Sequence, residues 1–367
     1  MEPTKIMPVQ ATAVPVQQSM ERQPQQAQVV SANGMDFAAF SNLANITQLE
    51  FKQGNVFWEA VSGGAMPNSY MVKERNSGQA IFLMQEESDC WCRVCCSPSQ
   101  PAYVKFFNSS PPQLVPERGC CCFKIAAHNR FNKIGAPVLT FEKTGLCDNF
   151  AQFNSTNCCV WMACCQSEAW MHTGNINTTY SRNCCVDHWE FPAGKPGQAD
   201  KTNMFAHAIV PIGGGCLTPT VNLMSREGMV AETQFAVIEG PTFFGGCMDL
   251  CCRTEFSISS QAGKSGNLGI IRKKTPEGSC GMCVALCSPA DTYNLDFTQG
   301  NNLTPKQKAA ILGEMIHLDF LFFEADQPIC RLSEDGKVCY ILLCTCYCMG
   351  ALCPVQCCCC NPPQGGG

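Results

Sequence analysis

The chain has 367 residues, of which 46% are hydrophobic and only 15% are charged, with a formal net charge of −5. This length predicts one large domain or two ordinary ones, and the apolar share is enough for a sizeable core. Non-specific nucleic-acid binding depends on an excess of lysine and arginine, so the net charge argues against nucleic acid as a partner. Attraction to anionic lipid would need local basic clusters or covalently attached lipid.

Cysteine is the most unusual feature of the composition, with 31 residues. This density is close to that of small disulfide-stapled secreted proteins. However, the polar N-terminus has no apolar signal-peptide core, the count is odd, and many cysteines are adjacent in sequence. Reduced thiols in the cytosol fit these facts better, and they are available for packing, metal binding or S-acylation. Clustered cysteines near apolar sequence are the usual setting for S-acylation.

The N-terminal residues 1–34 are rich in glutamine and proline and predict a disordered leader that could contact protein partners. From about Asp36, short apolar runs alternate with Gly, Pro, Asn and Ser. We expect strands over residues 79–84, 103–107, 138–141, 205–210, 234–238, 255–259 and 268–272. Short strands at this spacing predict an all-β sandwich or barrel. Residues 145–215 are interpreted as an insertion or as long excursions between strands.

A helix is predicted over residues 306–324, KQKAAILGEMIHLDFLFFE. Thr304 is a favourable N-cap, and Pro305 suits the first helical position. The run contains no helix breaker except Gly313.

This helix is apolar on nearly every face from residue 309 to 323, so it is buried all round or lies in lipid. It falls short of the roughly 20 residues that span a bilayer. Glu314, His317 and Asp319 would also be costly at membrane depth. We therefore expect a helix enclosed by β structure, with a lipid-embedded helix as the alternative.

The C-terminal region, residues 338–367, begins with an uncharged stretch, VCYILLCTCYCMGALCPVQCCCC, over residues 338–360. Gly350 and Pro354 argue against a clean membrane-spanning helix. Two interpretations remain: a last strand at 338–343 followed by a tail, or an S-acylated anchor in or on the membrane. The anchor is favoured, because four reduced cysteines in a row have no packing reason beside apolar sequence. Stable anchoring needs a second signal besides one acyl chain.

Several motifs resemble the phospholipid scramblase family. ADTYNLDF (290–297) and KAAILGEMIHLDFLFFE (308–324) resemble its C-terminal signature. ESDCWCRVCCSPSQPAYVKFF (87–107) and EGPTFFGGCMDLCCRTEFSI (239–258) resemble its cysteine-rich turns, each followed by a strand. The matches occur in the family's order.

The resemblance implies a mainly β domain over residues 35–330. Its fold would be a closed antiparallel tubby-like β barrel around a central apolar C-terminal helix, in agreement with the strand and helix pattern. It further implies a non-enzymatic protein at the cytosolic face of the plasma membrane. This protein would move phospholipids between leaflets in both directions, with calcium and without ATP or another nucleotide. The rival hypothesis is an acyl-anchored adaptor that binds a lipid headgroup or a protein and moves no lipid.

The resemblance also implies lipidation at Cys120, Cys121 and Cys122. The C-terminal run adds Cys357, Cys358, Cys359 and Cys360 as candidate lipidation sites. For calcium, the candidate ligands are Asp291 and Asp296, with neutral oxygens nearby. Two carboxylates predict only a weak site, because calcium takes six to eight oxygens. The alternative is a plain alternating strand, in which Asp296 faces away from Tyr293, Leu295 and Phe297.

Zinc binding and catalysis are the remaining chemical alternatives. Zinc-like cysteine spacings occur at Cys92 and Cys95 and at Cys280, Cys283 and Cys287. With 31 cysteines such spacings arise by chance, so no zinc is assigned. The five histidines belong to no recognisable nucleophile–base motif, so no catalytic residue is assigned.

Overall fold

The computed structural model describes residues 40–54, 68–87, 102–108, 137–143, 167–174, 204–211, 214–226, 232–260, 266–275, 292–298, 303–323, 329–332 and 338–360. The predicted leader lies outside these ranges.

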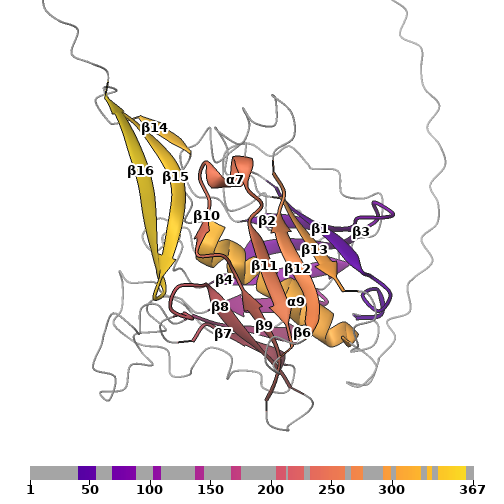
Figure 1. The fold of residues 1–367 in the computed structure, drawn as a ribbon. Coiled ribbons are helices and arrows are strands. Elements are labelled where there is room, and N and C mark those ends of the chain that lie inside the picture. The colour runs from indigo at the N-terminus through magenta and orange to yellow at the C-terminus, as the bar shows by residue number, and fades with distance from the viewer. Residues whose placement is uncertain are drawn as a thin grey trace, which may run out of the picture.

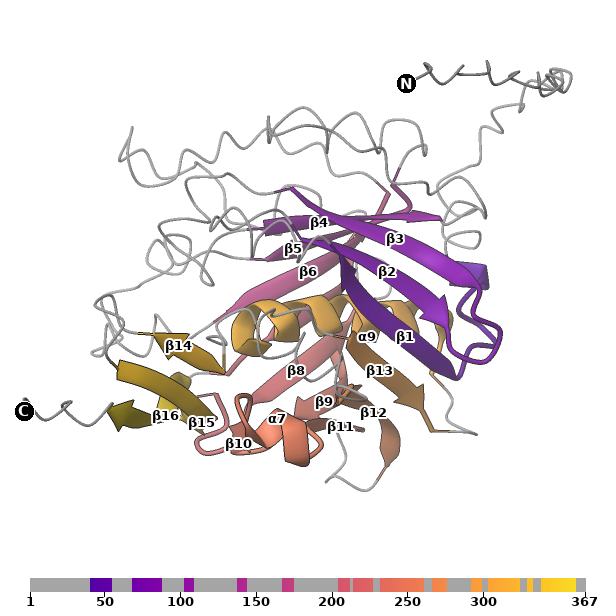
Figure 2. The same ribbon diagram turned by 90° about the horizontal axis from the view of Figure 1, so that it is seen from above.

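Twelve antiparallel strands form a closed barrel in the order β1-β13-β12-β11-β9-β8-β7-β6-β5-β4-β3-β2. Closure leaves none of these strands with an unpaired edge. Figures 1 and 2 show the strands wrapped around one helix, α9. The prediction of a mainly β protein, with a closed antiparallel barrel around a central apolar C-terminal helix, is confirmed.

The barrel strands are β1 (Gln48–Gly54), β2 (Ser69–Glu74), β3 (Ala80–Glu87), β4 (Ala102–Asn108), β5 (Leu139–Lys143), β6 (Glu168–Thr173), β7 (Met204–Ile209), β8 (Thr220–Ser225), β9 (Thr233–Glu239), β11 (Glu255–Ser259), β12 (Asn267–Lys273) and β13 (Thr292–Phe297). Successive side chains of a strand point to opposite faces, and in several of these strands buried and partly exposed residues alternate. In β13, Tyr293, Leu295 and Phe297 are buried, whereas the residues between them are partly exposed.

Helix α9 (Pro305–Leu318) fills the barrel and continues into a π-helical turn, η1 (Asp319–Phe323). Thr304 and Gln307 form a capping box: the Gln307 amide donates to the Thr304 hydroxyl at 3.3 Å, and the Thr304 amide donates to Gln307 Oε1 at 2.9 Å. Every side chain from residue 308 to 318 is buried. The predicted enclosed helix is confirmed, and its predicted start agrees with the cap. The π-turn was not predicted.

The segment 145–215 contributes two strands to the barrel, β6 and β7. This stretch was interpreted as an insertion or as long excursions between strands, and β6 at residues 168–173 is a barrel strand within it that was not predicted. Strand β6 is buried on both faces, with only its first and last residues partly exposed. A strand buried on both faces lacks the polar–apolar alternation that identifies a half-buried strand.

The C-terminal region forms a second sheet beside the barrel. Its strands are β10 (Phe243–Phe244), β14 (Cys330–Leu332), β15 (Val338–Cys348) and β16 (Ala351–Cys360), and the short helix α7 (Met248–Cys251) follows β10. β15 pairs with β16 along its length and with β10 and β14 on its other edge. Figure 1 shows the β15–β16 hairpin standing to one side of the barrel.

The hairpin differs from one of the two interpretations of this region, a short strand at 338–343 followed by a tail. Met349 and Gly350 have φ values of 50° and 87°. Positive φ at both central residues is typical of the tight turns that join antiparallel strands. Gly350, which argued against a helix in the sequence, is thus half of a hairpin turn. Within the described residues, no helix combines the length and the apolar character that crossing a bilayer requires.

Candidate functional site

Asp319 fixes the C-terminal end of α9 to the barrel wall. Tyr70 of β2 donates a hydrogen bond to its Oδ2, and Tyr293 of β13 donates one to its Oδ1, each at 2.6 Å. All three side chains are buried. A buried carboxylate is costly unless it is hydrogen-bonded, so the two phenols stabilise the charge and hold the helix end in place.

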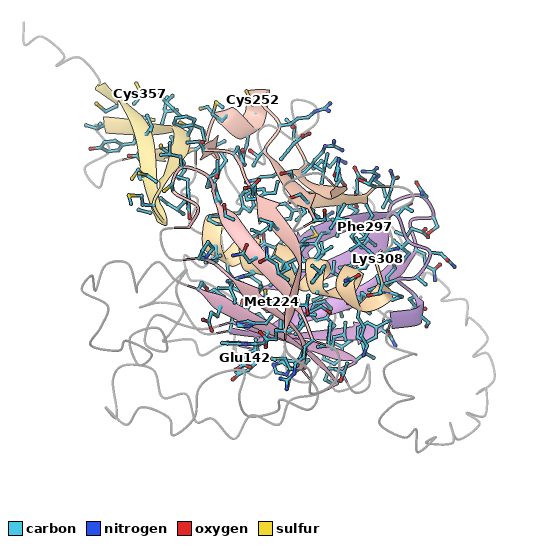
Figure 3. All side chains as sticks on the ribbon, turned by 60° about the horizontal axis from the view of Figure 1, so that its bottom comes forward. Glu142, Met224, Cys252, Phe297, Lys308 and Cys357 are labelled. Carbon is cyan, nitrogen blue, oxygen red and sulfur yellow. The ribbon has the colours of Figure 1, made fainter. Side chains whose placement is uncertain are left out.

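Lys308 fixes the other end of the helix. Its Nζ donates to the backbone carbonyls of Leu43, Ala44 and Ile46 at 3.2, 2.9 and 2.8 Å. It also lies 5.4 Å from the centre of the Phe297 ring (Figure 3). Burial lowers the pKa of Lys308, because it removes water from the ammonium group. The three carbonyls replace the lost water contacts.

A third polar group joins the C-terminal part of α9 to Ser167, which directly precedes β6. Ser167 Oγ lies 2.9 Å from His317 Nε2, and His317 Nδ1 lies 3.1 Å from Glu314 Oε1. This order of hydroxyl, imidazole and carboxylate resembles a nucleophile with its base. However, the three side chains are only 6%, 0% and 1% exposed. The neighbouring cavity, which Glu314 lines, measures about 10 Å³. No substrate fits there, so the group stabilises the packing of the helix.

On the outer surface, a chain of ion pairs crosses several strands. Arg272 of β12 contacts Glu255 of β11 at 2.6 Å and Asp296 of β13 at 2.9 Å. Arg75, which follows β2, contacts the other oxygen of Asp296 at 2.8 Å. The hydrogen bond from Arg272 to Glu255 is the main cause of the raised pKa of that guanidinium. These ion pairs connect β11, β12 and β13 to the residue that follows β2.

The predicted orientation of Asp296 is confirmed: it lies on the outer face, opposite Tyr293, Leu295 and Phe297. The contacts of Asp296, however, do not suit it for binding calcium. Each of its oxygens already contacts a guanidinium, whereas calcium needs several free anionic oxygens. Asp291, the second predicted ligand, lies outside the described residues. The described part of this segment does not fit a calcium ion.

In the described ranges, no group of three or more His, Cys, Asp or Glu side chains is placed to hold a metal. The cysteines with zinc-like spacing, at residues 92, 95, 280, 283 and 287, lie outside those ranges.

A surface pocket of about 340 Å³ lies beside the ion-pair chain. Its lining includes the carboxylates Glu239 and Glu255 and the hydroxyls Thr218 and Ser257. This volume is near the lower end of the range for small-ligand pockets. By contrast, the cavity of about 10 Å³ beside α9 is far too small for a lipid headgroup. Of these two spaces, only the one on the outside of the barrel could accept such a group.

The predicted lipidation cysteines fall into two sets. Cys120, Cys121 and Cys122 lie outside the described residues, and Cys357, Cys358, Cys359 and Cys360 end strand β16. Cys357 and Cys358 are exposed, and Figure 3 shows Cys357 far from the barrel. Successive residues of a strand point to opposite faces. Cys357 and Cys358 therefore point to opposite faces of β16, although residues 357–360 form one cluster in the sequence.

Another charged group surrounds His207 on the outer face of β7. Its Nδ1 lies 3.1 Å from Glu232 and its Nε2 lies 3.6 Å from Glu168, while its ring stacks on Trp170 at 5.1 Å. Burial opposes the charged imidazolium, but the two carboxylates outweigh it and raise the pKa of His207 above 6.5.

Comparison with known proteins places these features in a family. The family model described as Scramblase matches residues 215–325. Phospholipid scramblase 2 from Bos taurus is 24% identical over 282 residues, covering 77% of this chain and 70% of that protein. Phospholipid scramblase 1 is 23% identical over 290 residues in Homo sapiens and 22% over 284 in Mus musculus. Each covers 77% of this chain, which spans 65% and 62% of those two proteins.

These matches support the phospholipid scramblase family as the family of this chain. The matched scramblase segment contains β8 to β13, α9 and η1. It supplies Asp296, His317 and Asp319. No solved structure matches the chain.

Asp296, His317 and Asp319 each have one further partner upstream of the matched segment: Arg75, Ser167 and Tyr70. Sequence reasoning missed all three. The pairs are separated by 150 to 249 residues, and an Arg, Ser or Tyr in or beside a strand carries no local sign of a distant partner.

Proposed function

We propose that this chain exchanges phospholipids between the two leaflets of a membrane, in both directions and without ATP. The observation that carries the proposal is the scramblase family match, which covers the central helix and the strands from β8 to β13. The relatives are named phospholipid scramblases, which supplies the substrate class. We place the protein at the cytosolic face of the plasma membrane.

In this proposal the barrel is a rigid support, and the phospholipid contacts its outer surface. The interior supports this arrangement: α9 is fixed at both ends, and the cavity beside it measures about 10 Å³. Opening a path through the core would break the buried hydrogen bonds of Asp319 and expose that carboxylate to the acyl chains.

We further propose that thioester-linked acyl groups attach the protein to the membrane, at Cys120, Cys121, Cys122 and at the cysteines that end β16. The exposure of Cys357 and Cys358 supports the second group. Hydroxylamine cleaves thioesters, so it should shift part of the membrane-bound protein into the soluble fraction. Replacing the seven cysteines with serine should lower the membrane-bound fraction to the same level without hydroxylamine. If neither treatment changes the membrane-bound fraction, acyl groups do not contribute to attachment.

Calcium dependence stays a prediction from the family resemblance. Because Asp296 is occupied by two arginines, no step of the proposed exchange is assigned to calcium through that residue. The functional assay therefore has one arm with calcium and one with a chelator.

The second candidate function is an acyl-anchored adaptor, which binds a lipid headgroup or a protein and moves no lipid. The tightly packed interior favours it, because the described barrel contains no polar passage that a headgroup could follow.

The assay that separates the two functions uses vesicles with a fluorescent phospholipid and a membrane-impermeant quencher. In protein-free vesicles only the outer-leaflet half of the label is quenched. If the chain exchanges lipid, quenching proceeds well beyond that half, and it does so for lipids with different headgroups. If quenching stops at the outer leaflet although the protein is bound, in both the calcium and the chelator arms, the adaptor function replaces the proposal.

A further inference from the structure

Exposed large hydrophobic side chains are concentrated at one place on the described surface. The five are Leu217 (59% exposed), Phe243 (51%), Met349 (45%), Leu343 (42%) and Val355 (42%). Three of them belong to the β15–β16 hairpin. Phe243 pairs with Cys346 of β15, and Leu217 follows Cys216, whose carbonyl accepts a hydrogen bond from Met349. Apolar side chains gathered in this way mark an interaction surface.

The strand register shows which hairpin residues share this surface. Tyr347 is only 1% exposed and packs toward the barrel, so its neighbour Cys346 lies on the opposite, outer face. Cys353 lies directly opposite Cys346 on β16, and Phe243 lies beside it on β10. By the same alternation, Val355 and Cys357 lie on the outer face of β16 with Cys353. We call Phe243, Cys346, Cys353, Val355 and Cys357 the thiol face.

The charge distribution around this face limits what can bind it. Residues 338–360 contain no Asp, Glu, Lys or Arg. Beyond the hairpin, α7 approaches β15 through a hydrogen bond from the Cys247 amide to the Leu342 carbonyl, 3.0 Å long. The carboxylate of α7, Asp249, is paired with Lys273 of β12 at 2.8 Å. Arg253, two residues after α7, and Lys274, directly after β12, are both exposed. Exposed cations on the elements next to an uncharged apolar hairpin complement the headgroups of an anionic bilayer.

We propose that the thiol face lies flat on a phospholipid bilayer, with its side chains at the boundary between headgroups and acyl chains. The depth follows from the backbone: β16 pairs only with β15 among the described strands. Its other edge carries polar groups that the hydrocarbon core cannot satisfy. The face thus rests on the surface and does not span. This inference does not require the protein to move lipid, so it stands apart from the proposed exchange.

The test measures binding of the full-length chain to vesicles after hydroxylamine treatment in reducing buffer, so that acyl groups play no part. Vesicles of phosphatidylcholine, with and without phosphatidylserine, are separated from free protein by flotation. We expect Val355→Glu to lower the partition coefficient about tenfold, because it replaces an apolar side chain that the bilayer would bury with a carboxylate. Gln356→Glu adds the same charge one residue later, on the opposite face of β16, and should change binding less than about twofold.

Phe243→Ser is a second test on a different strand, and it adds no charge. Thermal melting shows whether each variant folds. If Val355→Glu does not fold, vesicle binding of Phe243→Ser decides the test alone. Unchanged binding of a folded Val355→Glu or Phe243→Ser protein would overturn the proposal, as would an equal loss in Gln356→Glu. A third outcome is that the wild-type protein binds no vesicles but forms a dimer, and that Val355→Glu converts this dimer to monomers. That result would assign the thiol face to contact with a second copy of the chain instead. Normal vesicle binding without lipid exchange would refute the proposed function alone.

Discussion

Two aspartates of the scramblase segment are held by partners from distant parts of the chain. Asp319 is buried and receives hydrogen bonds from Tyr70 and Tyr293, whereas Asp296 is on the surface and contacts Arg75 and Arg272. In both cases the partners occupy both carboxylate oxygens. The two residues therefore act first as connections between barrel elements, and a further ligand would have to displace one of these contacts.

We expect Asp296→Asn to lower the free energy of unfolding by about 1 kcal/mol, because it leaves two neighbouring guanidinium groups without their shared carboxylate. Glu50→Gln is the matched control. Glu50 lies on β1, opposite Asn294 of β13, and its replacement removes a carboxylate from the same outer surface. Chemical denaturation of both variants measures the difference. Calcium titrated into wild type and Asp296→Asn should give the same heat. A calcium signal lost only in Asp296→Asn would show that this carboxylate is a ligand after all.

His207 should make stability depend on pH in a defined direction. Because Glu168 and Glu232 raise its pKa above 6.5, the folded state holds the proton more tightly than the unfolded state. This contribution is fully present below the unfolded pKa and is lost as the pH rises through the folded pKa. The stability difference between wild type and His207→Gln should thus be on the order of 1 kcal/mol near pH 6 and shrink toward about pH 9. A difference that stays constant over this range would contradict the assignment.

At the scale of elements, strands with one buried face and the capped helix were predictable. β12 and β13 alternate, and Thr304 with Pro305 marks the start of α9. β6 is buried on both faces and carries Glu and His within a short run, whereas β5, also buried along its length, was found from its apolar residues. The hairpin was missed because cysteine occupies both faces of β16, at Cys357 and Cys358, and the outer face of β15, so neither strand shows a polar–apolar alternation. A local sequence pattern indicates that one face of a strand is buried. It carries no information on which distant segment covers the opposite face.

The position of the hairpin depends on a close contact at Gly214. Its φ is +54°, and a Cβ there would overlap the Tyr347 hydroxyl, which donates a hydrogen bond to the Gly214 carbonyl at 2.9 Å. We expect Gly214→Ala to detach the hairpin tip and to speed limited proteolysis within residues 338–360. Gly78→Ala is the matched control, because Gly78 has a similar φ of +68° but no atom within 4 Å of the added Cβ. Equal proteolysis of both variants would show that backbone strain alone, and not the contact with Tyr347, causes the effect.

At the scale of the whole molecule, the structure separates a rigid barrel from an uncharged hairpin. The barrel is closed, its helix is held at both ends, and its interior is packed. The hairpin carries most of the exposed large apolar side chains described. The family match and the position of this surface together give the central claim: lipid is contacted at the outside of the molecule, while α9 stays enclosed.

Hydrogen–deuterium exchange of the full-length chain, with and without anionic vesicles, tests this claim most directly. Amide exchange reports local opening of the structure, so a helix that leaves the barrel loses its protection. We expect peptides from residues 305–318 to exchange equally slowly in both samples, and peptides from residues 338–360 to exchange more slowly when vesicles are present. Faster exchange over residues 305–318 on vesicle binding, with no change in the hairpin, would contradict the account, because it would mean that the helix enters the membrane.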